Sequence, residues 1–250
     1  MKLTQALSAL ALALAVAVSV VAAPAAHAAD DTLRVATDAT FPPLEFVKDG
    51  KRTGFDIELI EAMAKTMGKK VQWVDIDFKG LIPGLIANRF DVAASGIYMT
   101  DERRKVVDFT DPYYKGGLVV VVRKNDTSIK TPADLDGKKV TVQVGTKSVA
   151  FLKDNYPKVQ RVEVEKNQEM FDLVNIGRAD AAVTGRPAAV EYAKVQPNVR
   201  VLDKGLSTEL YGFALRKDET ALTADMNKAL QTLRANGTYD ALATKWFGKQ

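Results

Sequence analysis

The chain has 250 residues, 47% hydrophobic and 26% charged, with a formal net charge of +4. It contains no cysteine, and its single histidine, His27, lies in an apolar N-terminal segment. Beyond that segment there is therefore no thiolate nucleophile, no Ser-His-Asp triad and no ordinary zinc site, and we expect neither a metal nor a cofactor. The basic residues are scattered among acidic ones without forming a stripe, which argues against nucleic-acid binding.

The first 28 residues have the pattern of a secretory signal peptide. Lys2 precedes a continuous apolar run, and Ala26-His27-Ala28 offers the small-x-small pattern of a signal peptidase site. We therefore expect cleavage after Ala28 and a periplasmic mature protein, freely soluble because no cysteine is present to carry a lipid anchor. The alternative is an uncleaved membrane anchor, since residues 6–23 are just long enough to span a bilayer.

Strand-like and helix-like segments alternate along the rest of the first half. We expect strands over residues 32–38, 70–77 and 90–96, and helices over residues 54–68 and 81–89. The longer helix has apolar residues on one face, acids at its start and Gly68 at its end. This βαβ alternation predicts a parallel sheet covered by helices.

The second half repeats this pattern. Strands are expected over residues 138–146, 160–165 and 179–185, and helices over residues 148–156 and 168–178. The segment NRFDVAASG (88–96) also resembles GRADAAVTG (177–185), since both place Arg-x-Asp before an apolar strand that ends in a hydroxyl residue and glycine. Such strands recur by chance in α/β proteins; we favour the alternative, two α/β lobes of similar build.

Two further β-rich runs, residues 113–124 and 208–217, suggest two crossings between the lobes. The tail, residues 218–247, is expected to be helical with a break at Asn236-Gly237, and to return to the first lobe. Ligands bind outside the carboxyl ends of the strands in open α/β sheets. We therefore expect a cleft lined by the strand ends, which are Asp38, Ser95-Gly96, Gly145-Thr146 and Thr184-Gly185.

The start of the helix expected after residue 100 carries an unusual charge. Thr100 is a good N-cap ahead of two acids, but Arg103 and Arg104 follow in the first turn. A positive charge there opposes the helix dipole at a cost of about 0.3–1 kcal/mol. Either Arg103 is an ordinary surface residue, or an anion bound beside it offsets this cost.

Several segments together resemble the motifs of the family 3 solute-binding proteins, which serve ABC importers of polar amino acids. They are VATDATFPPLEF, GFDIELIEAMAKTM, DFKGLIPGL, TDERRKVVDFTDPYY, DLDGKKVTVQVGT and LRANGTYDALATKWFG, in the family's order and most similar to periplasmic glutamine-binding proteins. The resemblance implies an α/β, two-lobed periplasmic-binding-protein fold with central parallel-rich sheets and a two-strand hinge. It places lobe 1 at residues 29–112 and 212–250, the hinge strands at 113–117 and 207–211, and lobe 2 at 118–206.

The resemblance also implies a ligand-binding site. Arg103 would clamp the ligand's α-carboxylate through charge-assisted hydrogen bonds, with free backbone N–H groups near Gly96 and Tyr98 as further donors. Two phenylalanines would stack on the ligand's aliphatic part, although such residues are otherwise more often core. Tyr98 replaces a smaller hydroxyl residue common in the family. The full set is Asp38, Phe41, Phe78, Ser95, Gly96, Tyr98, Arg103, Gln143, Thr146 and Thr184.

The identity of the ligand stays open at three positions. Asp38 would accept from an amide, guanidinium or ammonium, and Gln143 stands where glutamine binders often carry a lysine. Glutamine is our first expectation, with arginine, lysine, histidine or glutamate as alternatives. Gly185 stands where the family usually has an aspartate that pairs with the α-ammonium. Either Glu209 or Glu191 substitutes, or the alignment slips by a residue or two, or the ligand lacks an ordinary α-amino group. If the site takes α-amino acids, Gly185→Asp should tighten binding, and no gain would favour a compensating acid or a different ligand.

The implied function is that of a monomeric receptor that delivers a polar amino acid to an inner-membrane ABC permease and has no enzymatic activity. A few family relatives resemble dehydratases of cyclic acids, of the cyclohexadienyl or arogenate type. In such an enzyme Glu209 or Asp38 would donate the proton. A sensory ligand-binding domain is the third alternative, which we do not favour because no membrane helix follows in the sequence.

Overall fold

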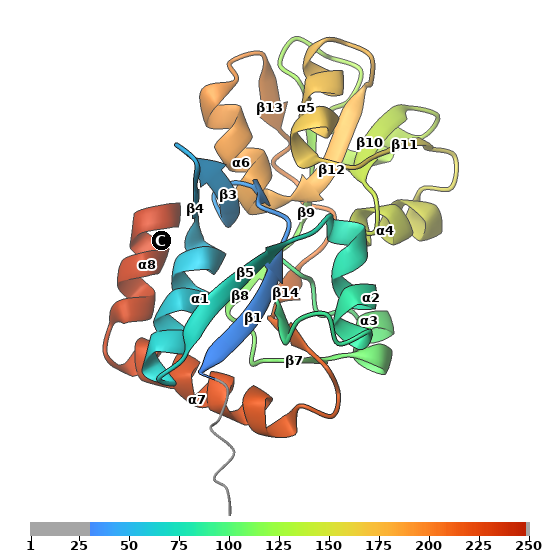
Figure 1. Cartoon of the computed structure of the whole chain (residues 1–250). Coiled ribbons are helices and arrows are strands. Elements are labelled where there is room, and N and C mark those ends of the chain that lie inside the picture. The colour runs from blue at the N-terminus through green and yellow to red at the C-terminus, as the bar shows by residue number, and fades with distance from the viewer. Residues whose placement is uncertain (1–30, 249–250) are drawn as a thin grey trace, which may run out of the picture. The chain divides into compact units, whose positions relative to one another are not determined.

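Two five-stranded sheets form the framework of a two-lobed α/β fold, which the computed structural model describes for residues 31–248 (Figure 1). The expected signal peptide lies outside the described residues. Within residues 31–248, no helix combines the length and the apolar character needed to cross a membrane.

The first sheet is built mainly from the N-terminal third of the chain. Its strands lie in the order β5 (Lys70–Asp75), β1 (Thr32–Thr37), β6 (Val92–Ala93), β15 (Ala214–Leu215) and β7 (Asp108–Phe109). Strand β1 is parallel to β5 and β6, whereas β15 is antiparallel to β6 and β7. The predicted helix over residues 54–68 is α1 (Phe55–Thr66), which buries its apolar face against β5.

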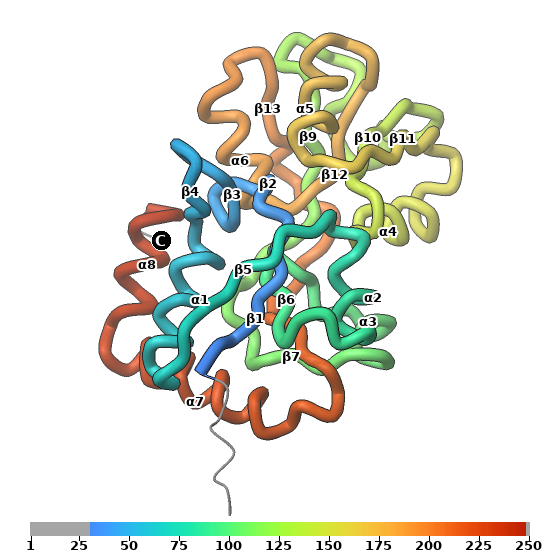
Figure 2. Tube along the Cα trace, in the orientation of Figure 1, coloured from blue at the N-terminus to red at the C-terminus, as the bar shows by residue number. Residues whose placement is uncertain are grey.

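The other helices of this lobe come from both ends of the chain. They are α2 (Leu81–Ile86), α3 (Asp101–Val106), α7 (Thr220–Ala235) and α8 (Thr238–Phe247). The C-terminal helices α7 and α8 both contact α1, and Figure 2 shows these red segments beside the blue and cyan N-terminal ones. The tail therefore returns to the first sheet. Thr100 caps α3, as predicted, by accepting a 3.3 Å hydrogen bond from the Arg103 backbone N–H.

The second sheet has the same pattern of parallel and antiparallel strands as the first. Its order is β11 (Gln160–Val164), β10 (Lys139–Gln143), β12 (Ala181–Gly185), β9 (Leu118–Arg123) and β13 (Val199–Val201). Strand β10 is parallel to β11 and β12, and β9 is antiparallel to β12 and β13. Helices α4 (Lys147–Asn155), α5 (Asn167–Asn175) and α6 (Arg186–Val195) cover it. The two similar sequence segments supply β6 and β12, which occupy the same third place in the two sheets.

Two smaller sheets complete the fold. Strands β8 (Tyr114–Gly116) and β14 (Glu209–Tyr211) pair antiparallel, and each lies in the chain between segments of the two large sheets. Strands β2 (Thr40–Phe41), β3 (Glu45–Lys48) and β4 (Lys51–Thr53) form an antiparallel sheet that follows β1. This last sheet was not anticipated from the sequence.

Candidate ligand-binding site

The carboxyl ends of four strands, two from each large sheet, surround one cavity. Asp38 follows β1, Ser95 and Gly96 follow β6, Gln143 ends β10, and Thr184 lies at the end of β12. A 3.0 Å hydrogen bond from Gln143 Nε2 to Asp38 Oδ2 joins the two sheets directly. The cavity is small and largely closed: about 30 Å³ is accessible to the centres of water-sized molecules.

Every residue predicted for the site lines this cavity, namely Asp38, Phe41, Phe78, Ser95, Gly96, Tyr98, Arg103, Gln143, Thr146 and Thr184. The sequence did not single out Glu45, Lys147, Ser148, Asn167, Val183 or Tyr211, which line it as well. For Glu45, an acidic residue within an otherwise apolar segment could have indicated a functional position. For Asn167, the signal was its position directly after a strand at a carboxyl end.

Arg103 lies half-buried between the two lobes. Its Nη1 donates to the backbone oxygen of Tyr98 at 2.9 Å and its Nη2 to that of Gly145 at 3.1 Å. The guanidinium carbon lies 5.5 Å from the centre of the Phe78 ring. Burial lowers the pKa of Arg103 to about 10, against a smaller opposing effect of Glu102. No carboxylate within residues 31–248 forms an ion pair with this guanidinium, which leaves a cation at the cavity that an anionic ligand group would complement.

Asp38 is almost completely buried, and the chain itself supplies four donors to its carboxylate. Thr40 Oγ1 and Lys166 Nζ donate to Oδ1 at 3.0 and 2.9 Å. The backbone N–H of Phe78 and the amide of Gln143 donate to Oδ2 at 3.1 and 3.0 Å. A carboxylate offers about four acceptor positions. In this structure they are filled from both sheets, so Asp38 is not an open acceptor for a ligand.

A chain of buried amides and a hydroxyl continues from Asp38 along the cavity wall. The second N–H of Gln143 donates to the backbone oxygen of Glu165 at 3.0 Å, and Asn167 Nδ2 donates to Gln143 Oε1 at 2.6 Å. Thr184 Oγ1 in turn donates to Asn167 Oδ1 at 3.3 Å. These contacts determine which way the Gln143 amide faces: its NH₂ points to Asp38 and its oxygen to Asn167.

The polar groups of Ser95 and Gly96 are already engaged within the protein. The Ser95 hydroxyl accepts from the Asp38 backbone N–H at 3.1 Å and donates to Glu45 Oε1 at 2.9 Å. The Gly96 backbone N–H, expected to be free, donates to Asp56 Oδ2 at 2.9 Å. That expectation was wrong, because Asp56 of α1 lies beneath the loop and takes the N–H.

Glu45, which lines the cavity, and Asp56, which does not, form a buried acid pair. Burial and the neighbouring Asp56 raise the pKa of Glu45 well above its usual range, in spite of the Ser95 hydrogen bond. Burial raises the pKa of Asp56 to about 6, although hydrogen bonds from Tyr113 and Gly96 oppose the rise. Glu45 Oε2 and Asp56 Oδ1 have no other hydrogen-bond partner among the described residues. Each carboxyl group therefore holds a proton more tightly than it does in water.

Two tyrosines occupy the space where the resemblance places an aspartate. The rings of Tyr98 and Tyr211 stack with centres 4.4 Å apart, and the Tyr211 hydroxyl donates to that of Tyr98 at 3.0 Å. A Cβ atom at Gly185 would collide with the Tyr211 hydroxyl and lie 3.2 Å from both Phe41 Cζ and the Tyr98 hydroxyl. An aspartate at 185 therefore does not fit unless the Tyr211 hydroxyl shifts, and on these steric grounds we no longer expect it to tighten binding.

The two acids considered as substitutes have partners of their own. Glu209 forms an ion pair with Lys147 at 2.5 Å, and Glu191 forms one with Lys194 at 2.9 Å. Glu209 lines a neighbouring hollow rather than this cavity. Within the described residues, no cluster of three potential acidic, histidine or cysteine metal ligands occurs.

The sequence profile of the bacterial extracellular solute-binding proteins, family 3, matches residues 33–249. The chain belongs to this family. A relative of this solute-binding protein is the "ABC transporter arginine-binding protein 1" of Escherichia coli (strain K12), which is 32% identical over 225 residues that cover 88% of this chain and 92% of the relative.

Solved structures agree with this assignment. "An ancestral arginine-binding protein bound to glutamine" is 43% identical to this solute-binding protein with a TM-score of 0.84, over 88% of this chain and 99% of the other. The ancestral amino acid-binding protein AncCDT-1, described as "a precursor of cyclohexadienyl dehydratase", is 44% identical with a TM-score of 0.82, over 87% and 96% of the two chains. The family and the two-lobed fold are thus those expected from the motifs.

Proposed function

We propose that this protein is the periplasmic binding component of an ABC importer, that its ligand is a polar amino acid, and that glutamine is the first ligand to test. The observation that carries the proposal is the half-buried guanidinium of Arg103, which lies between the lobes without an acidic partner in the described chain. The ligand's carboxylate supplies the missing anion. Charge-assisted hydrogen bonds of this kind contribute about 1.5–3 kcal/mol each.

The aromatic residues at the cavity suit the aliphatic part of such a ligand. Phe78 lies against the Arg103 guanidinium, and Phe41 approaches both Gly96 and Gly185. Both rings are only partly buried in the described structure, so each offers a face to the cavity.

Delivery to the permease requires two states of the receptor. We propose that residues 113–117 and 207–211, which contain the paired strands β8 and β14, form the hinge between lobe 1 (29–112 and 212–250) and lobe 2 (118–206). A ligand that contacts both lobes stabilises only the closed state, which a monomeric receptor then presents to the permease. We further propose export through a signal peptide cleaved after Ala28, which N-terminal sequencing of the periplasmic protein would test.

Basic amino acids or glutamate are the alternative ligands. The relatives include the ABC transporter arginine-binding protein 1, and the ancestral arginine-binding protein is described as bound to glutamine. A dehydratase is the remote alternative, because AncCDT-1 is described as a precursor of one. The two acids considered as proton donors are engaged, Asp38 by four donors and Glu209 by Lys147. We therefore favour binding without turnover.

A ligand screen tests the proposal. The protein is unfolded and refolded to remove bound solute, and its melting temperature is measured with each of the twenty amino acids and with their decarboxylated and keto analogues. Hits are then titrated by calorimetry. We expect a shift with glutamine that its decarboxylated analogue does not produce. Binding that does not require a carboxylate would contradict the proposal, and conversion of prephenate or arogenate would favour the enzyme.

A further inference from the structure

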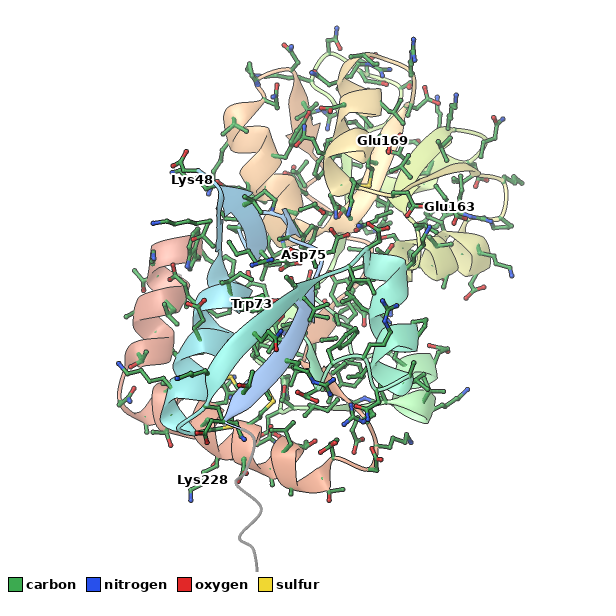
Figure 3. All side chains as sticks on the ribbon, viewed as in Figure 1. Lys48, Trp73, Asp75, Glu163, Glu169 and Lys228 are labelled. Carbon is green, nitrogen blue, oxygen red and sulfur yellow. The ribbon has the colours of Figure 1, made fainter. Side chains whose placement is uncertain are left out.

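A lysine outside the recognised motifs binds Asp38, a deeply buried acid of the candidate site. Lys166 lies between β11 and α5, on the second sheet, and its Nζ is 2.9 Å from Asp38 Oδ1 and 2.8 Å from Asp77 Oδ1. Both acids belong to the first sheet, where Asp77 lies two residues beyond Asp75, the residue labelled at the end of β5 in Figure 3. The ammonium therefore links the lobes through two carboxylates.

Lys166 contacts Asp38 at a neighbouring hollow and does not line the cavity. Asp38 lines both the candidate ligand cavity and a neighbouring hollow, whereas Lys166 and Asp77 line only that hollow. Lys166 thus compensates the charge of Asp38 without occupying the ligand's volume. Asp77 is half exposed, so solvent screens its charge, whereas the Asp38 side chain is only 3% exposed. Asp38 is consequently the acid for which the counter-charge matters most.

The titration behaviour of the group is consistent with this arrangement. Burial alone would lower the pKa of Lys166, but hydrogen bonds to Asp77 and Asp38 outweigh it and raise the pKa. The hydrogen bond from Lys166, together with its charge, lowers the pKa of Asp77. The lysine is therefore firmly cationic.

The free polar groups beside Asp38 suit an amide better than a cation. Both N–H donors of Gln143 are used, on Asp38 and on the backbone of Glu165. Asn167 uses one N–H on Gln143 and keeps the other, and the Thr184 oxygen is able to accept a hydrogen bond. A ligand carboxamide both accepts and donates, whereas a guanidinium or an ammonium only donates.

We propose that Lys166 determines the side-chain specificity of the pocket by compensating the charge of Asp38, so that the pocket favours a ligand with a neutral distal amide over one with a basic side chain. Lys166 is a positioning residue, because it acts through Asp38 rather than by contact with the ligand. The proposal rests on the function proposed above. The family likeness does not distinguish a glutamine-like from an arginine-like ligand, and we assign this choice to Lys166.

The test compares ratios of affinities. Glutamine and arginine are titrated by calorimetry into the refolded full chain and into Lys166→Met, which keeps the apolar stem and removes the charge. The control is Lys79→Met. This substitution also removes an ion pair between the lobes, the one between Lys79 and Glu165 at 2.5 Å, but Lys79 does not contact Asp38. In the unaltered protein we expect glutamine to bind at least about tenfold more tightly than arginine. Lys166→Met should lower this preference at least about tenfold, and Lys79→Met should leave it within about threefold.

A lysine that only holds the lobes together would weaken both ligands equally. An unchanged preference in Lys166→Met, or tighter arginine than glutamine binding in the unaltered protein, overturns the inference while the proposed function stands. Absence of any amino acid binding in the unaltered protein overturns both. If circular dichroism shows that Lys166→Met does not fold, Lys166→Gln is measured in its place with the same expectation.

Discussion

The Tyr211 hydroxyl donates a 3.0 Å hydrogen bond to the Tyr98 hydroxyl across stacked rings, directly beside Gly185. This pair fills the space in which the resemblance places an aspartate. Tyr211 is fully buried and Tyr98 nearly so, which means that any shift of these rings must be taken up by the packed residues or the cavity around them. Selection at this end of the cavity is therefore made by shape and by two hydroxyl groups rather than by an acid at residue 185.

We expect Gly185→Asp to destabilise the protein and to weaken ligand binding. Inserting atoms into a packed site costs about 1–3 kcal/mol, which denaturant unfolding would measure. Gly185→Ala should cost less in a Tyr211→Phe background than alone, because the hydroxyl is the closest obstacle. Tighter binding by Gly185→Asp at unchanged stability would show that the Tyr98 and Tyr211 side chains shift to make room for the aspartate.

Arg103→Met should remove ligand binding without harming the ligand-free fold. Loss of two charge-assisted hydrogen bonds to a carboxylate predicts at least about a 100-fold lower affinity in calorimetry. The melting temperature without ligand should stay the same or rise, because a half-buried cation without an acidic partner is costly. Arg104→Ala is the matched control, since its guanidinium lies over Phe109 instead. Retained affinity in Arg103→Met would remove the main support for the proposed function.

Asp38→Asn should weaken every ligand rather than only cationic ones. The carboxylate receives donors from both sheets, and an asparagine offers one oxygen where the carboxylate offers two. We expect at least about a tenfold loss for glutamine, together with a more open average shape in small-angle scattering. Asp77→Asn, which removes the other Lys166 partner at a half-exposed position, should have a smaller effect. If Asp38→Asn lowers the affinity only for arginine or lysine, Asp38 contacts the ligand's side chain directly, as the resemblance implied.

The buried acid pair predicts how stability depends on pH. Burial raises the pKa of Asp56 to about 6 and that of Glu45 further above its usual range, so the native state holds protons that the unfolded chain releases. This contribution is complete below the unfolded values of about 4 and is lost as the pH rises through the native values. For Asp56 the loss amounts to about 3 kcal/mol.

Glu45→Gln tests this dependence, because it removes one titrating group while keeping the size of the side chain. The free energy of unfolding of the variant should exceed that of the unaltered protein at pH 8, and the difference should shrink toward pH 4. Glu61→Gln, at an exposed position of α1, is the control. Parallel pH profiles for all three proteins would contradict the raised pKa values of the acid pair.

Periodicity and local signals determined much of this fold. The alternation of apolar segments predicted β1, α1 and β5 and the equivalent elements around β10, because burial on one face imposes a characteristic repeat on each element. The Thr100 cap followed from the local sequence around the start of α3, whereas the place of Arg103 at the cavity followed from the family resemblance. The strand ends also indicated which residues would meet, since parallel strands bring their carboxyl ends to one edge of a sheet.

Only the tertiary structure decided how those residues are engaged. Lys166 and Asp38 are 128 residues apart, and the Gly96 N–H meets an acid 40 residues away. The crowding at Gly185 comes from Tyr211 and Tyr98, which lie on distant segments. A sequence encodes local propensity and the spacing of apolar faces, whereas the pairing of a particular donor with a particular acceptor depends on how distant elements pack. The family and the cavity were thus readable from the chain, while the charge balance inside the cavity was not.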